Sequence, residues 1–412
     1  MLAHSVGGGA LPAPPWLLSY IGAAFVFGTA AVLRVSWPTA RLTGSDVAAA
    51  PTRHPAPVRV GPGPIVGLVV LVAVLYAALA GPDSAAANIA PVAVLVVWWV
   101  GLPLVCLLLG DVMRHVNPFV AVVAGLQRVR HSDDGVGEPT TAPMWTSAAF
   151  LAAFSWYFLA YHRPGSPRSL ALFLVLYAGL AVAGGLRWGR AWLAEGDGFA
   201  GLSAAVARIG LRRPAGPAPA GTAALMVVWL GGTGFDAFSS TPFWTDVLGT
   251  SRGWTRTMVN SVGLLWITAV VAGVVLVVVR LAERDQEEPG RRLTVPLGVA
   301  LVPLATGWFL SHDLTLLLFE GQNFYALLSD PLSRGWNLFG TLTHTIDFGI
   351  VQSGWVRGAQ IAVLVAGHVA TVVLVHDRAL SLLRRRPAMR TTWAMATAAA
   401  ASITAAALLV LT

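Results

Sequence analysis

Ten separate stretches of about 17 to 25 predominantly apolar residues run through the chain, each as long as an α-helix needs to cross a hydrocarbon layer. Of its 412 residues, 56% are hydrophobic and only 11% are charged, about half the charged share of an ordinary soluble domain. We therefore predict an all-α fold, a polytopic transmembrane helix bundle that forms one integral-membrane domain over residues 1–412. The expected spans are 16–36, 65–81, 89–110, 144–162, 169–187, 222–241, 258–281, 296–319, 355–376 and 391–411.

The basic residues indicate which side of the membrane each connection faces. All 27 are arginine; 21 lie in the connections after the first, third, fifth, seventh and ninth spans, and 6 lie in the opposite connections. Because cytoplasmic connections carry an excess of Lys and Arg, the split predicts that both termini lie outside. It also explains the net charge of +8 without a nucleic-acid-binding face.

The absence of lysine and the presence of only one cysteine exclude several functional classes. The sequence contains no lysine, which removes a P-loop, a retinal or pyridoxal Schiff base, a Ser-Lys pair and a binuclear centre bridged by carbamylated lysine. Cys106 is the single cysteine, so an intramolecular disulfide, a thiolate zinc cluster and an iron–sulfur site are excluded. Any metal site must use His, Asp and Glu.

Four connections differ from the rest in composition. Residues 43–64 are rich in Pro, Ala and Gly, and we expect a flexible cytoplasmic linker. Residues 111–130 and 187–213 carry apolar residues at helical spacing beside arginines, which predicts anchoring helices in the interface plane. The outside connection 320–354 is too apolar for free solvent. There we expect a partly re-entrant or membrane-capping segment.

Two short motifs match catalytic patterns in the wrong context. GDGFAG, residues 196–201, has the Gly-x-Gly-x-x-Gly spacing, but RAWLAE rather than a strand precedes it, so a dinucleotide fold is not supported. GTSRG, residues 249–253, has nucleophile-elbow spacing in an outside loop with no strand before it. Neither motif is expected to be catalytic.

Ionisable residues within the spans are the candidate functional groups, because charge in hydrocarbon is costly and normally faces a bundle interior. His312 and Asp313 lie in the outer part of the eighth span, and Glu320 shares a face with Asp313 seven residues later. In the sixth span Asp236 belongs to a polar stripe that reaches a similar depth. We expect His312 and Asp313 to meet Asp236 inside the bundle, with Glu320 at the mouth of the same cavity.

Further histidines lie at other depths. His344 and Asp347 are three apart in the outside connection, which would bring them together on a helix. His368 is deep in the ninth span, and His376 lies at its cytoplasmic end, where an interfacial position is expected. Histidines in membrane bundles also serve simply as interhelical hydrogen-bond donors. A single tight site that holds all of them is not expected.

Several segments of the sequence resemble a family of bacterial polytopic membrane proteins known as fenitrothion hydrolases. The similar segments are SHDLTLLLFEGQNFYALLSDPLSRGW (311–336), VAGHVATVVLVHDRAL (365–380), GDVMRHVNPF (110–119), LAEGDGFAGL (193–202) and the opening HSVGG. The resemblance covers most of the chain. It implies a protein of the bacterial inner membrane that hydrolyses organophosphate triesters, with possible metal assistance.

Three hypotheses follow for the polar residues. In the first, His312, Asp313, Asp236 and Glu320 bind a divalent metal ion and His344 acts as an additional ligand or general base on an apolar ester. In the second, polar groups staggered in depth form the path of a transporter or metal-handling permease: His344 outermost, then His312 and Asp236, then His368 and finally His376. The third, a haem or quinone protein, needs two histidines at equal depth on facing spans, which the spacing disfavours. The sequence leaves the oligomeric state open.

Overall fold

The computed structural model describes residues 14–42, 61–129, 143–211, 219–284, 286, 293–351 and 354–409. Throughout these ranges the secondary structure is helical and contains no strand. The first half comprises α1 Pro15–Ser36, α2 Pro62–Ala80, α3 Ile89–Val92, η1 Ala93–Trp98, α4 Trp99–Leu109, α5 Met113–Val116, α6 Pro118–Val129, α7 Pro143–Ser155, η2 Trp156–Ala160, α8 Pro167–Trp188, η3 Trp192–Ala194 and α9 Gly198–Ala207. The second half comprises α10 Thr222–Ser239, α11 Pro242–Leu248, α12 Gly253–Arg284, α13 Thr294–Val299, α14 Val302–Ser329, α15 Phe348–Val351, α16 Gly354–Leu382 and α17 Arg385–Leu409.

Eight helical stretches in the described part of the chain are long and apolar enough to cross a membrane. They are Trp16–Ser36, Pro62–Ala80, Ile89–Leu109, Pro167–Trp188, Gly253–Arg284, Thr294–Ser329, Gly354–Leu382 and Arg385–Leu409. The two other predicted spans are helical as well: Met144–Ala160 is apolar but shorter, and α10 has 18 residues. The all-helical class predicted from the sequence is therefore confirmed for the described residues, and eight of the helical stretches could span a membrane.

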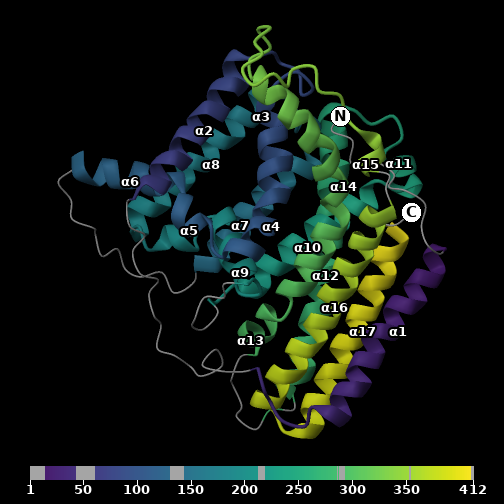
Figure 1. The fold of residues 1–412 in the computed structure, drawn as a ribbon. Helices are drawn as coiled ribbons and strands as arrows, with labels where there is room; N and C mark the ends of the chain where they lie inside the picture. The colour runs from purple at the N-terminus through teal and green to yellow at the C-terminus, as the bar shows by residue number, and fades with distance from the viewer. Residues whose placement is uncertain are drawn as a thin grey trace.

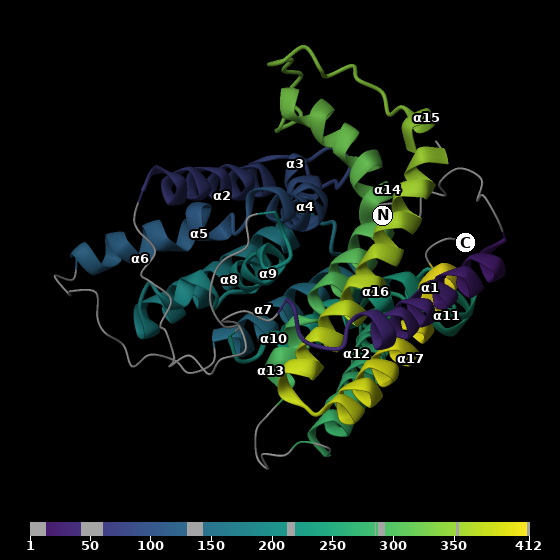
Figure 2. The same ribbon diagram turned by 60° about the horizontal axis from the view of Figure 1, so that its bottom comes forward.

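The helices form two groups that meet at α14 (Figures 1 and 2). One group contains α2 to α9, and the other contains α10, α12, α14, α16, α17 and α1, with the first helix of the chain packed against α16 and α17. The membrane-length stretch that ends in α14 is 83% buried, against 17% for α2. α14 is thus the central helix, and its polar residues lie inside protein.

A close crossing between α14 and α16 fixes the position of the central helix. A Cβ atom added at Gly367 would lie 2.5 Å from the carbonyl oxygen of Pro303, and one at Gly307 would lie 2.8 Å from that of Val363. Neither distance is compatible with a side chain, so glycine is needed on both helices. Small residues that let backbones approach are typical of membrane helix interfaces.

A second close approach holds α10 beside α12. A Cβ atom at Gly231 would lie 2.4 Å from the hydroxyl oxygen of Thr268. The glycines at 231, 232 and 234 lie one turn before Asp236, in a helix that contacts both α12 and α14. The glycine-rich turn therefore lets α10 pack tightly while Asp236 faces a helical neighbour.

The boundaries of two predicted segments need correction. Helix α14 continues to Ser329, so the connection predicted at 320–354 begins at residue 330, and it contains the short helix α15. Residues 352–353 lie outside the described part. Of the predicted linker 43–64, residues 43–60 also lie outside it, and α2 already begins at Pro62. Apolar helices run past the ends of their hydrophobic windows because polar residues can extend the same helical hydrogen-bonding pattern.

The prediction of an interface-plane helix within 187–213 is wrong for α9. All ten residues of α9 are buried, whereas an interfacial helix needs one polar, exposed face. The Gly-x-Gly-x-x-Gly spacing here serves packing, since a Cβ atom at Gly198 would lie 2.9 Å from the backbone nitrogen of Leu151 and one at Gly201 2.1 Å from the hydroxyl of Ser147. By contrast, α6 buries one face against α2 and α8 and leaves residues such as Leu126 and Arg128 exposed.

Candidate functional site

The side chains of Asp236 and His312 meet between α10 and α14. His312 donates a hydrogen bond from Nε2 to Oδ2 of Asp236 over 3.2 Å. Thr233, one turn below Asp236, bonds instead to the carbonyl of Trp229 in its own helix. The predicted contact between the polar stripe of the sixth span and the His-Asp pair of the eighth is thus observed.

Asp313 completes a group of three. One ligand atom from each of Asp236, His312 and Asp313 lies within 4.8 Å of the other two. Asp313 is only 3% exposed. Within the described residues no hydrogen bond reaches its carboxylate; its electrostatic partners are His312 and Asp236. A buried carboxylate without a donor is costly to keep, which marks this trio as the strongest candidate for a ligand site.

The trio has the chemistry of a divalent metal site. Two carboxylates and one imidazole suit zinc, manganese or iron, whose bonds to such ligands are about 2.0 to 2.2 Å long. Two ligands of one such ion lie about 3 to 3.5 Å apart. The 3.2 Å between Asp236 and His312 already fits this separation, and a ligand atom of Asp313 lies within 4.8 Å of one atom of each. Three protein ligands leave coordination positions for water or substrate.

An aromatic layer lies along the same helices toward their N-terminal ends. Trp229, seven residues before Asp236, stacks near Phe309, three residues before His312, with ring centroids 5.1 Å apart. The indole nitrogen of Trp229 is buried, and so is the hydroxyl of Ser311. Neither atom has a hydrogen-bond partner within the described residues. Each of the two helices thus carries one buried polar atom that the described residues leave without a hydrogen bond.

Glu320 does not belong to the trio. Its carboxylate is buried and accepts a hydrogen bond from Asn323, 3.2 Å away in the same helix. Two helical turns separate Glu320 from Asp313, which is about 10.5 Å along the axis. The structure therefore does not bring this predicted ligand within the same small group.

His344 and Asp347 are not paired on a helix, contrary to the expectation from their spacing. Both are exposed in the non-helical part of the connection before α15. His344 packs edge-on against the ring of Tyr325, with centroids 5.4 Å apart. Asp347 accepts a hydrogen bond from Gln322 at its carbonyl and donates one from its backbone nitrogen to Oε1 of Gln322. Helix formation fails here because the backbone bonds to side chains instead.

His368 is held in an interhelical network apart from the trio. Its Nδ1 donates to the carbonyl of Leu364 over 2.7 Å, so Nε2 accepts from the hydroxyl of Ser402 over 3.1 Å. Trp308 donates to the same hydroxyl oxygen. The network joins α14, α16 and α17 and occupies both ring nitrogens. His368 thus acts as a structural histidine.

His376 and Asp377 anchor the segment that follows α1. His376 is fully buried rather than interfacial as predicted, and its Nε2 donates to the carbonyl of Trp37 over 3.0 Å. Asp377 accepts hydrogen bonds from the indole of Trp37 and from the backbone nitrogens of Arg41 and Leu42. These two residues hold the end of the first helix against α16.

The sequence motifs did not single out a further buried carboxylate, that of Asp197. It caps α9 through the backbone nitrogens of Phe199 and Ala200 and accepts side-chain bonds from Asn117 over 2.8 Å and Tyr177 over 3.1 Å. Burial raises the pKa of the Asp197 carboxyl, and its hydrogen-bond donors partly oppose that rise. The segments GDVMRHVNPF and LAEGDGFAGL meet at this point. An aspartate before a helix-like run was the available signal.

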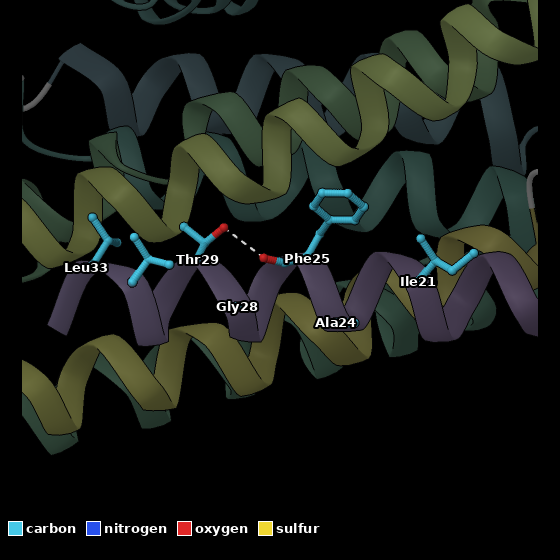
Figure 3. A pocket seen from close by; sticks show the side chains of 7 residues that line it. Ile21, Ala24, Phe25, Gly28, Thr29 and Leu33 are labelled. Carbon is cyan, nitrogen blue, oxygen red and sulfur yellow. Dashed lines mark hydrogen bonds between the residues drawn. The ribbon is translucent and has the colours of Figure 1, made fainter. Parts of the chain in front are cut away.

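A shallow groove of about 570 Å³ runs along α1 (Figure 3). It is lined by Ile21, Ala24, Phe25, Gly28, Thr29, Val32 and Leu33. Thr29, the polar member, donates its hydroxyl to the carbonyl of Phe25. The groove carries no ionisable group and no member of the trio.

Comparison with protein-family models, curated proteins and solved structures yields no match for this chain. The fold and the trio are therefore the basis for a functional proposal.

Proposed function

We propose that this chain is a bacterial inner-membrane protein that crosses the membrane ten times, with both termini outside. We further propose that Asp236, His312 and Asp313 bind a divalent metal ion within the bundle. The activity proposed for this site is hydrolysis of an apolar phosphoric or phosphorothioic triester, as the resemblance to fenitrothion hydrolases implies.

The environment of Asp313 is the observation that carries the metal proposal. Asp313 is only 3% exposed, and a second carboxylate, that of Asp236, lies beside it. Two like charges at this distance repel strongly in a medium of low dielectric constant. His312 donates a hydrogen bond to one of them, Asp236, but as a neutral imidazole it cancels no charge. A divalent cation would offset both carboxylate charges and give Asp313 a bonding partner that it does not have among the described residues.

A metal ion at this position would provide Lewis acidity and lower the pKa of a bound water molecule. Hydroxide would add to phosphorus and the phosphorus–aryloxy bond would break, so that the aryloxide leaves. The chain itself would contribute the three ligands and the apolar seam of Trp229 and Phe309, which suits an aromatic ester. Such esters partition into bilayers and could meet the site from the membrane.

The roles of Glu320 and His344 are proposed more narrowly. Glu320 lies two turns from Asp313 toward the end of α14, where it could attract a cation toward the trio. His344 contacts Tyr325 rather than a member of the trio, so no contact in the described residues supports a role for it as an additional ligand or general base.

Transport along a polar path is the second candidate, and less supports it. Such a path would pass from His312 through His368 to His376. Both ring nitrogens of His368 are engaged in the α14–α16–α17 network. His376 is engaged by Trp37 and Thr392. Side chains that are held in fixed structural hydrogen bonds are poor transient binding sites for a moving ion.

The test is hydrolysis of an aryl phosphotriester by the purified protein in lipid vesicles, with and without added zinc or manganese. The proposal predicts metal-dependent release of the phenol, and a loss of at least about a hundredfold in Asp313→Asn. His115→Ala, at an exposed position in α5, serves as the matched control. Metal-dependent uptake of the ion into vesicles without hydrolysis would favour the transport candidate instead.

A further inference from the structure

The connection from residue 330 to residue 351, here called the cap segment, presents its large apolar side chains outward. Among them, Leu338 is 60% exposed and Phe339 is 64% exposed. Phe348 and Ile350 at the start of α15 are also exposed. A loop in water would turn such side chains toward the protein, because exposed apolar patches of this kind are rare on soluble surfaces.

Three polar side chains at the base of the segment, those of Ser329, Asp330 and Thr341, are buried. Ser329, at the end of α14, is fully buried and accepts hydrogen bonds from the backbone nitrogens of Phe339 and Thr341, each over 3.1 Å. Asp330 is buried and accepts from the backbone nitrogens of Arg334 and Gly335 over 2.8 and 2.7 Å. The segment thus buries these polar groups at its base while several of its large apolar side chains are exposed.

The backbone of the cap segment is also satisfied from within. Oδ1 of Asn337 accepts from the backbone nitrogen of Leu342, and Oε1 of Gln322 accepts from that of Asp347. Non-helical backbone in contact with a membrane requires such internal partners because lipid offers none. A segment that remained in water would not need them.

The position of the segment fits the end of the hydrocarbon layer. Ser333 bonds to the carbonyl of Ala87, in the turn between the membrane-length helix α2 and α3. Arg334 lies over the ring of Trp336, 5.7 Å from its centroid. Trp and Arg side chains are enriched where lipid headgroups begin. The exposed polar residues 343–345 are tolerated at this depth but not in the hydrocarbon core.

We propose that the cap segment is embedded in the headgroup–acyl boundary of the leaflet where α14 ends, with lipid covering Leu338, Phe339, Phe348 and Ile350. The occupant is lipid rather than a protein partner because the exposed surface continues that of the membrane helices, including Trp355 at the start of α16. The inference rests on the chain crossing a membrane and does not depend on the metal site.

The test places a single fluorophore on the cap segment in vesicles of phosphatidylcholine and phosphatidylglycerol. Phe339→Cys and Phe348→Cys are made separately in a Cys106→Ser background and labelled with an environment-sensitive dye. Quenching is then compared between iodide in the aqueous phase and nitroxide-bearing phosphatidylcholine. Val262→Cys, at an exposed position in the first third of α12, is the lipid reference, and Thr250→Cys, in the turn before α12, is the polar-turn reference.

Lipid-borne nitroxide at the shallow acyl position should quench both cap labels nearly as well as it quenches the Val262 label. The iodide quenching constant of each cap label should be at most about one third of that of the Thr250 label. Iodide quenching equal to that at Thr250 would overturn the proposal, because the segment would then be solvated. Protection from both quenchers would also overturn it, since a partner protein or a second copy would then cover the surface.

Discussion

Oδ2 of Asp236 and Nε2 of His312 lie 3.2 Å apart between two helices that are both largely buried. This separation is that of a hydrogen bond and also that of two ligands on one metal ion. The same geometry can therefore exist with or without a bound ion. What distinguishes the two states is Asp313, whose carboxylate gains a partner only when an ion is present.

The close crossing of α14 and α16 predicts a specific loss of stability. Gly367→Ala would place a methyl group 2.5 Å from the carbonyl of Pro303, and forcing the helices apart should cost about 1 to 3 kcal/mol. Gly273→Ala in α12, where nothing lies within 4 Å, is the control and should be neutral or slightly stabilising. Thermal unfolding of the purified variants in detergent measures both. Equal midpoints would show that the crossing is not tight.

Asp197 should make stability depend on pH. Burial raises the pKa of its carboxyl above the ordinary value of 3.8, so the folded state binds a proton more tightly than the unfolded state does. Stability from this group is therefore fully present below pH 3.8 and is lost as the pH rises through the raised folded value. The unfolding midpoint of the wild type should fall relative to that of Asp197→Asn over this window. A constant difference between the two proteins would contradict the assignment.

The anchor at the end of α1 gives a prediction that separates stability from metal binding. Asp377→Ala removes the acceptor of three part-buried hydrogen bonds from Trp37, Arg41 and Leu42, at a cost of about 1 to 3 kcal/mol. Metal content per folded molecule should remain that of the wild type. Asp246→Ala, at an exposed position in α11, is the control. A lower metal content in Asp377→Ala would mean that the two regions are coupled.

The arginine distribution predicts that both termini lie on the outer face. Epitope tags at either end should be accessible to antibody on intact spheroplasts, and the Arg-rich turn around residue 385 should become accessible only after the membrane is permeabilised. One accessible and one protected terminus would rule out an even number of spans.

Hydrophobic pattern was sufficient to predict the helical class, because a bilayer permits few other spanning structures. Depth along the helices was also sufficient to predict that Asp236 meets His312, since it depends on regular helix geometry. The seven-residue spacing of Asp313 and Glu320 was not sufficient to bring Glu320 into the trio. The non-helical conformation around His344 and Asp347 was not predictable from the sequence. Side chains distant along the chain, such as those of Gln322 and Ser329, accept hydrogen bonds from backbone nitrogens of the cap segment. The burial of α9 was hidden as well: its glycines serve contacts with α7, which only tertiary structure reveals.

The metal content of the purified protein tests the central claim most directly. Wild-type protein, loaded with zinc or manganese and passed through a desalting column, should retain about one ion per chain by mass spectrometry. His312→Ala and Asp236→Asn should each retain less than about a tenth of that amount while keeping the wild-type unfolding midpoint within a few degrees, because each loses one of three ligands. His115→Ala should bind like the wild type. Unchanged stoichiometry in His312→Ala would contradict the account, because the Asp236–His312–Asp313 trio would then not be the metal site.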